Sequence, residues 1–275
     1  MTRMLREALR DSLGDEAGRV WGAFDQIGDV VVVRIPAGMM HRRAEIGRAL
    51  LDGVGPARAV FCQVSPVGGE RRTRDLERIA GEGGTRTEYR ESGCRLAVDA
   101  GRAYFTPRLS TERARIAGLV RPGEVVLNMF GGTGAFSIIA ARDTECTVYN
   151  VDINPDAIDL CGRSIAMNRT AGVVVPVLGD AAEVSAGLPK ADRILMPLPE
   201  GSDGFLGAAA GAAAAGCTIH YYTHVAAARK QEAGRAAEAR LRGAYPGDIE
   251  VVSSRTVRAV GPRYYQAVVD ARVPG

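Results

Sequence analysis

The chain of 275 residues has very few lysines, no cysteine pair at metal-binding spacing and no long apolar run. Its five cysteines are an odd number, and no two of them are spaced as Cys-x-x-Cys, which argues against a disulfide framework and against a cysteine zinc site. His220 and His224 are four residues apart, but the β-branched and aromatic residues around them favour a strand over a helix with two ligands on one face. We therefore expect buried, reduced thiols and no metal site.

The sequence also shows no signal peptide and no membrane-spanning segment. No stretch near Met1 has the form of a signal peptide, and no apolar run reaches the roughly 18 residues of a membrane helix. The alanine- and glycine-rich segment 207–216 is too short and too weakly apolar to span a bilayer. We expect a cytoplasmic protein that has no membrane contact and acts as a monomer.

Almost all basic residues are arginines, since Lys190 and Lys230 are the two lysines in the sequence. The net charge is only +3, but residues 58–121 hold 13 arginines against 8 acidic residues, a local balance of +5. The planar guanidinium can bind two phosphate oxygens at once. The excess fits a nucleic-acid footprint, and it also fits a solvated charged face.

The hydrophobic pattern divides the chain into three parts. Residues 1–24 predict one or two amphipathic helices, with Leu5 and Trp21 among the apolar positions. Residues 25–107 predict a small α+β module, and residues 108–275 predict a catalytic domain of alternating strands and helices. In the module we expect strands at 27–36, 59–64, 85–90 and 94–98 and a helix at 41–51. In the catalytic domain we expect helices at 110–120, capped by Ser110, and at 226–241, and two last strands at 249–253 and 264–270.

A glycine-rich turn between a strand and a helix is the most informative feature of the chain. The apolar run 125–127 predicts a buried strand, glycines follow at once, and 137–142 predicts a helix. A second strand ends in Asp152, about 20 residues after the glycines, where an acidic residue grips a ribose hydroxyl in nucleotide-binding folds. A third strand at 173–178 precedes Asp180. The pattern predicts a doubly wound α/β domain; a Rossmann domain for another nucleotide and a turn without a ligand remain alternatives.

The turn resembles motif I of the class I methyltransferases that use S-adenosylmethionine (SAM). It has the form Gly132-x-Gly134-x-Phe136 and lacks the third glycine of the NAD fingerprint. The resemblance implies that the last two strands, 249–253 and 264–270, close the sheet as an antiparallel pair. It also implies that SAM is the cofactor and that five residues contact it: Phe130, Gly132, Gly134, Asp152 and Asp180.

Nearly the whole chain from Ile27 onward resembles one family, the archaeal and eukaryotic-type tRNA (guanine-37-N1) methyltransferases. The resemblance rests on residues 64–82, on 89–113 and on the SAM motifs, and its most specific part is the Tyr-Phe-x-Pro-Arg-Leu-x-x-Glu-Arg element at 104–113. The aminocarboxypropyl transferases of wyosine biosynthesis are a similar sister family. The resemblance implies a class I SAM-dependent methyltransferase (Rossmann-like) domain preceded by a small α+β RNA-binding module, with tRNA as the partner.

Several positions distinguish the two families. Pro107-Arg108-Leu109 and the run 152–155 resemble the methyltransferases, whereas the short layout ahead of Ile27 resembles the sister family. Pro197-Leu198-Pro199 stands where the methyltransferases have Asn-Leu-Pro, and Asn128 stands where they have aspartate. We predict methyl transfer to N1 of guanosine 37; aminocarboxypropyl transfer and a non-catalytic tRNA-binding relative remain alternatives.

The resemblance also implies roles for individual residues. Arg108 is the candidate catalytic residue, which would hydrogen-bond guanine O6; the alternatives are a phosphate clamp and a surface salt bridge. For Glu112 we expect an ion pair with Arg108 or Arg115. The candidate tRNA-binding residues are Arg71, Arg72, Arg74, Pro197 and Pro199.

Overall fold

The computed structural model describes residues 9–20 and 24–275, so Leu5 and Trp21 of the expected helical segment lie outside the described residues. Residues 9–13 are helical, and a 3-10 turn, η1, follows at Gly14–Arg19. The apolar side chains of this segment pack into one core with the helix of the small module: Leu9, Leu13, Ala17 and Val20.

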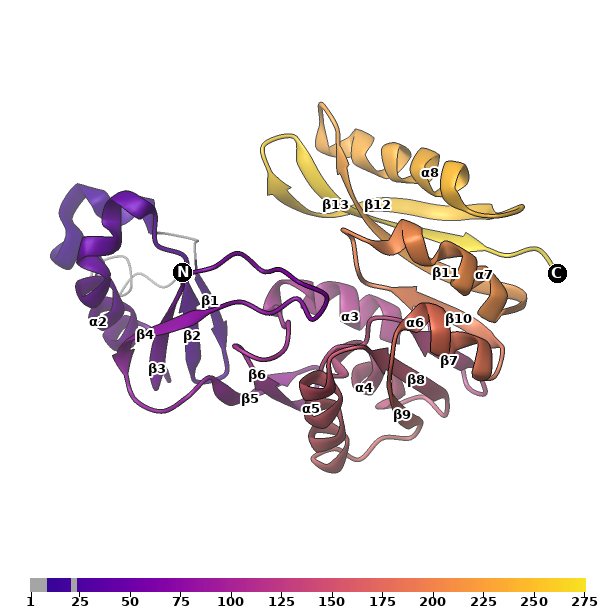
Figure 1. Cartoon of the computed structure of the whole chain (residues 1–275), viewed down its shortest axis with the longest axis horizontal. Coiled ribbons are helices and arrows are strands. Elements are labelled where there is room, and N and C mark those ends of the chain that lie inside the picture. Colours follow the sequence, from indigo (N-terminus) through magenta and orange to yellow (C-terminus); the bar gives the residue numbers. More distant parts are fainter. Residues whose placement is uncertain (1–8, 21–23) are drawn as a thin grey trace.

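The small module contains a four-stranded sheet of order β1-β2-β3-β4, at the left of Figure 1. Its elements are β1 (Phe24–Ile27), β2 (Val30–Val33), η2 (Ala37–Arg42), α2 (Arg43–Gly53), β3 (Ala59–Gln63) and β4 (Leu76–Gly81). Strands β2 and β3 are parallel, because α2 carries the chain back between them. The strand at 59–64 and the helix at 41–51 are confirmed; β4 was not foreseen.

The single strand expected over 27–36 is wrong, because the chain turns at Gly28 and Asp29. Residues on either side of the turn form the antiparallel hairpin β1–β2, with Ile27 opposite Val30. Gly28 has φ +58°, and a Cβ there would collide with the backbone of Glu88. Glycine is therefore required at this turn.

A second hairpin connects the module to the catalytic domain. Strands β5 (Arg86–Glu91) and β6 (Cys94–Asp99) form a separate two-stranded sheet, as expected at 85–90 and 94–98. Leu96 of this hairpin, Phe61 of β3 and Ile116 of α3 (Ser110–Ala117) belong to one hydrophobic cluster. The module and the catalytic domain thus share a continuous core.

The catalytic domain contains a seven-stranded sheet of order β12-β13-β11-β10-β7-β8-β9. Five strands are parallel, and β13 runs antiparallel to both of its neighbours, which confirms the expected final pair. The strand bounds are β7 (Val125–Asn128), β8 (Thr147–Asp152), β9 (Val173–Leu178), β10 (Ala191–Met196), β11 (Ala213–Ala226), β12 (Glu250–Gly261) and β13 (Tyr264–Arg272). His220 and His224 lie in β11, so the strand expected around them is confirmed.

Helices cover both faces of this sheet, and alternate residues of β10 enter different clusters. Leu195 packs with α3, α4 (Ala135–Ala141) and α5 (Pro155–Ala166), whereas Ile194 and Met196 pack with α6 (Ala181–Val184), α7 (Leu206–Ala212) and α8 (Ala233–Ala244). Short 3-10 segments complete the fold: η3 (Pro107–Leu109), η4 (Ser185–Gly187), η5 (Ser202–Phe205) and η6 (Lys230–Glu232).

One helix cap and one helix start differ from expectation, whereas α3 begins at Ser110 as expected. Ser110 is not the cap of α3, because η3 precedes the helix and the capping side chain is that of Thr106, whose hydroxyl accepts the backbone N–H of Arg108. The helix expected from 226 begins at Ala233, since β11 runs on to Ala226 and η6 follows.

The five cysteines are free and buried, as expected. Within residues 9–20 and 24–275, no helix combines the length and the apolar character needed to cross a bilayer.

Candidate active site

A cavity of about 410 Å³ opens where β7 and β8 end, at the edge where ligands bind in parallel α/β sheets. The glycine turn after β7 forms one wall. Four of the five residues expected to hold SAM line it: Phe130, Gly132, Asp152 and Asp180. The structure therefore brings these positions around one space, and their contact with SAM stays a prediction.

The glycines of the turn have separate structural reasons. Gly132 has φ +54° and lines the cavity, where a Cβ would meet no atom closer than the Tyr104 carbonyl oxygen at 3.7 Å. Gly134 has φ +83°, and its Cβ would lie 2.6 Å from Cys161 Sγ. A Cβ on Gly131 would collide with the side chain of Asn150. Gly132 thus leaves room at the wall, while Gly131 and Gly134 let the turn pack closely.

A buried chain of hydrogen bonds between side-chain amides and a hydroxyl supports the backbone of the turn. Asn128 Nδ2 donates to Ser137 Oγ (3.0 Å), which donates to Asn150 Oδ1 (2.6 Å), and Asn150 Nδ2 donates to the Gly132 carbonyl (3.4 Å). Asn128 is fully buried and does not line the cavity. Through Ser137 and Asn150, Asn128 therefore supports the backbone of the turn.

Asp152 is held by the backbone on both sides. Its Oδ2 accepts the Gly132 N–H (2.7 Å) and its Oδ1 accepts the Asn154 N–H (2.9 Å). Burial raises the pKa of Asp152, and the two hydrogen bonds oppose that shift. Asp180 caps α6 by accepting the Ala182 N–H (2.7 Å).

A second cavity, of about 440 Å³, lies between the small module and the catalytic domain. It shares part of its wall with the first cavity, including Arg72, Tyr104, Pro197 and Glu200. Five arginines line it against two carboxylates: Arg34, Arg72, Arg74, Arg108 and Arg258 against Asp25 and Glu200. Two adjoining spaces result, one beside the glycine turn and one rich in positive charge.

Arg108 lies on the wall of the second cavity, and its Nε donates to Asp25 Oδ1 of β1 at 2.6 Å. The side chain is 46% exposed, so this ion pair between the two parts of the chain is open to solvent. A salt bridge was one of the alternatives for Arg108, and its catalytic role stays a prediction.

The three candidate tRNA-binding arginines occupy different places. Arg71 lines the first cavity. Arg72 donates to Glu200 Oε2 (2.6 Å) and lies 5.1 Å from the ring centre of Tyr104. Arg74 is drawn into the second cavity, where burial lowers its pKa. Together they line the cavities and do not form one open face.

Pro197 and Pro199 belong to the loop after β10. Pro197 lines both cavities and Pro199 lines the second. The loop is fixed from two sides, because the His224 N–H donates to the Pro199 carbonyl (3.1 Å) and Ser202 Oγ donates to the Leu198 carbonyl (2.8 Å). The backbone of His224 therefore contacts this loop, a position for which the sequence offers no signal.

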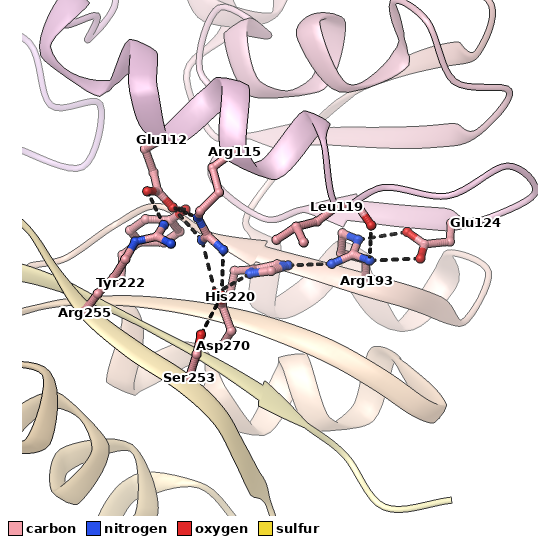
Figure 2. A network of polar contacts seen from close by, with 10 residues as sticks. All are labelled: Glu112, Arg115, Leu119, Glu124, Arg193, His220, Tyr222, Ser253, Arg255 and Asp270. Carbon is pink, nitrogen blue, oxygen red and sulfur yellow. Dashed lines mark hydrogen bonds and ion pairs between the residues drawn. The ribbon is translucent and has the colours of Figure 1, made fainter.

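A buried polar network, shown in Figure 2, joins α3 to the sheet. Glu112 forms an ion pair with Arg115 (2.6 Å), one of its two expected partners, and not with Arg108. It also accepts hydrogen bonds from Tyr222 and Arg255. Arg115 reaches Asp270 (2.6 Å), which bonds His220 Nδ1 (2.6 Å). His220 Nε2 in turn faces Arg193 (2.7 Å), which pairs with Glu124. Each member has a charged partner, so the burial of these charges is compensated.

The network predicts the pH dependence of stability. Burial lowers the pKa of His220, and because Arg193 can only donate, His220 is neutral and donates from Nδ1 to Asp270. Its folded-state pKa thus lies below the unfolded value of about 6.5, so the unfolded chain binds a proton first and stability falls as the pH drops below about 6.5.

Burial alone would raise the pKa of Asp270, but hydrogen bonds from His220 and Arg115 lower it to about 2. The stability that Asp270 contributes is present above pH 4 and is lost as the pH falls from about 4 to 2.

Urea unfolding measured from pH 8 to 5 tests the contribution of His220. In His220→Gln, the slope of the unfolding free energy against pH should decrease by the equivalent of about one proton. An unchanged slope would contradict it.

Comparisons with known proteins agree over both parts of the chain. A family model described as TRM5/TYW2 methyltransferase domain matches residues 87–243, and one described as TYW2 N-terminal domain matches residues 5–85. The chain is 39% identical over 261 residues to tRNA (guanine(37)-N(1))-methyltransferase Trm5b of Pyrococcus abyssi, an alignment that covers 91% of this chain and 74% of that protein.

Two further relatives extend the comparison. The chain is 32% identical over 255 residues to tRNA 4-demethylwyosine(37)-methyltransferase Taw21 of Saccharolobus solfataricus, covering 92% of this chain and 94% of that protein. A solved complex of aTrm5 with tRNALeu has a TM-score of 0.85 at 33% identity and covers 98% of this chain and 78% of that one.

Proposed function

The chain belongs to the TRM5/TYW2 methyltransferase family, and from this premise we propose that it is a SAM-dependent enzyme that methylates N1 of guanosine 37 in tRNA. One observation carries the proposal most directly. The cavity beside the glycine turn shares a wall with the arginine-lined second cavity. A methyl donor in the first and a nucleotide in the second would meet at that wall.

The residues of the first cavity fit SAM. The space is in the range of about 300–1,000 Å³ typical of small-molecule sites. Gly132 leaves room for close approach, and the carboxylates of Asp152 and Asp180 can accept hydrogen bonds from ribose and adenine. Phe130, packed edge-on against Phe205 at 4.8 Å, gives an apolar wall. When bound, SAM supplies an electrophilic methyl group on its sulfonium.

The chain's own residues would prepare the guanine. Arg108 can donate to O6 and stabilise the negative charge that develops there as N1 loses its proton. The carbonyls of the 197–199 loop stay available to the base, although Pro197 offers no side-chain amide. The arginines around the second cavity can bind the phosphates beside the target nucleotide.

Replacement of Asp152 by alanine should weaken SAM binding about 10- to 100-fold, because a ribose partner is lost and the Gly132 N–H loses its acceptor. Calorimetric titration measures this directly. Asp159→Ala is the matched control, since Asp159 forms an exposed ion pair with Arg163 on α5. Equal affinities for the native protein and D152A would contradict the assignment.

Mass analysis of modified nucleosides tests the reaction. The protein is incubated with SAM and tRNA carrying unmodified guanosine 37, and in parallel with tRNA carrying 4-demethylwyosine. One methyl gained on guanosine supports the proposal. An aminocarboxypropyl gain would instead identify the sister reaction, and no change despite tRNA binding would identify a non-catalytic relative.

Pro197 favours a second candidate, methylation of 4-demethylwyosine, the substrate named for the Saccharolobus solfataricus relative. Proline has neither a backbone N–H nor a side-chain amide, so this wall of the cavities offers an apolar ring. The tricyclic base carries no proton on its bridged N1 and needs fewer polar partners there. A methyl gain on the tricyclic base alone would establish this candidate.

We also infer that one chain acts alone in the cytoplasm. The five free thiols are buried, which suits a reducing compartment. Sedimentation of the purified protein measures the oligomeric state.

A further inference from the structure

His224 occupies an unusual position at the end of β11. The strand pairs with β10 as far as Tyr221, and His224 lies beyond that point, opposite Gln266 of β13. Both side chains line the second cavity, and Gln266 Oε1 accepts from Arg258 Nε (2.8 Å). A polar pair thus replaces the apolar residues that fill most of this sheet.

The imidazole of His224 lacks a partner at one nitrogen. Its Nε2 is buried and makes no hydrogen bond with any described residue, which for a buried polar atom is uncommon. Its Nδ1 lies 4.0 Å from Glu200 Oε1. Because a carboxylate only accepts, Glu200 favours the tautomer with the proton on Nδ1, which leaves a lone pair on Nε2.

The surroundings of His224 hold its tautomer and its position. Glu200 is held by its ion pair with Arg72, so its carboxylate stays on the Nδ1 side of the imidazole. The backbone N–H of His224 donates to the Pro199 carbonyl, and the centre of the imidazole ring lies 5.4 Å from that of the Tyr264 ring. Burial also lowers the pKa of His224, which keeps the ring neutral near pH 7.

We propose that His224 reads the target base by accepting a hydrogen bond at Nε2 from the exocyclic amino group of guanine. This rests on the proposed function, in which guanine N1 faces the first cavity. His224 lines the second cavity and not the first, so it reaches a group beside N1. The neighbours of N1 are O6 and the amino group; O6 only accepts, so the amino group is the partner for a lone pair.

The test uses tRNA with inosine at position 37, which lacks the amino group and keeps N1–H and O6. We expect the native protein to prefer guanosine over inosine by about tenfold in kcat/KM, the range of one hydrogen bond. In His224→Phe, which keeps a ring against Tyr264 but has no nitrogen, the preference should disappear. His224→Gln, whose amide oxygen can accept, should restore part of it.

Several outcomes separate the possibilities. Unchanged SAM affinity in H224F shows that the fold and first cavity are intact, and His224→Leu gives a second apolar variant should H224F be unstable. The same inosine preference in the native protein and in H224F would overturn the role of His224 alone. Absence of N1-methylguanosine with the native protein would overturn the proposed function and this inference with it.

Discussion

Arg108→Ala is expected to lower kcat by about 10²–10³ while SAM affinity stays unchanged. The guanidinium lies on the wall of the second cavity, outside the first, so its removal leaves the SAM residues in place. A donor directed at developing charge is typically worth this factor, because it acts mainly in the transition state. Single-turnover kinetics with guanosine-37 tRNA and calorimetry with SAM measure the two quantities. Lysine should not restore the rate fully, since it lacks the planar fork.

Asp25→Asn is the control that separates a catalytic role of Arg108 from a structural role in joining the small module to the catalytic domain. Arg108 donates to Asp25 at 2.6 Å and so joins β1 to the segment before α3. The D25N variant weakens this ion pair and keeps the guanidinium. We expect its turnover to stay within about threefold of native, since exposed ion pairs contribute little. An equal loss in R108A and D25N would show that Arg108 acts by holding the two parts together.

The glycine turn after β7 could be predicted from the sequence because it depends on residues that are neighbours in the chain. A strand that ends in glycines and opens a helix has few alternatives, and the acidic residue 20 positions on must lie at the same edge of a parallel sheet. Gly132 and Asp152 indeed meet through a 2.7 Å hydrogen bond. The antiparallel end of the sheet followed from the resemblance to the class I methyltransferases.

Features that depend on distant packing could not be read in this way. The run 27–36 is mostly apolar, and glycine is required at position 28 because the backbone of Glu88, 60 residues later, approaches it closely. Arg74 is predicted to bind tRNA, and its place on the wall of the second cavity depends on the packing of the two parts of the chain. The free nitrogen of His224 depends on two strands, β11 and β13, and on the loop after β10, so no local pattern reveals it.

The buried network could not be predicted from the sequence either, because it joins residues more than 150 positions apart. Glu112 and Arg115 are an ordinary helical pair until Asp270 and His220 are placed beneath them. Through these contacts α3, which follows directly on Arg108 and Leu109, is fixed to β11 and β13. The position of Arg108 therefore depends on charges far from the cavity.

Arg193→Met is expected to reduce the free energy of unfolding by about 3–5 kcal/mol, the usual effect of removing one partner from a buried ion pair. Arg193 is 6% exposed and serves three partners: Glu124 (2.8 Å), the Leu119 carbonyl (2.8 Å) and His220 Nε2 (2.7 Å). Methionine fills similar volume but leaves all three unpaired. Urea unfolding at pH 7.5, where His220 is neutral in both states, measures the loss. Arg163→Met, which breaks the exposed Arg163–Asp159 pair, should cost less than about 0.5 kcal/mol. A loss in R193M as small as that control would mean that solvent reaches Glu124 and His220, and that the network does not fix α3 to the sheet.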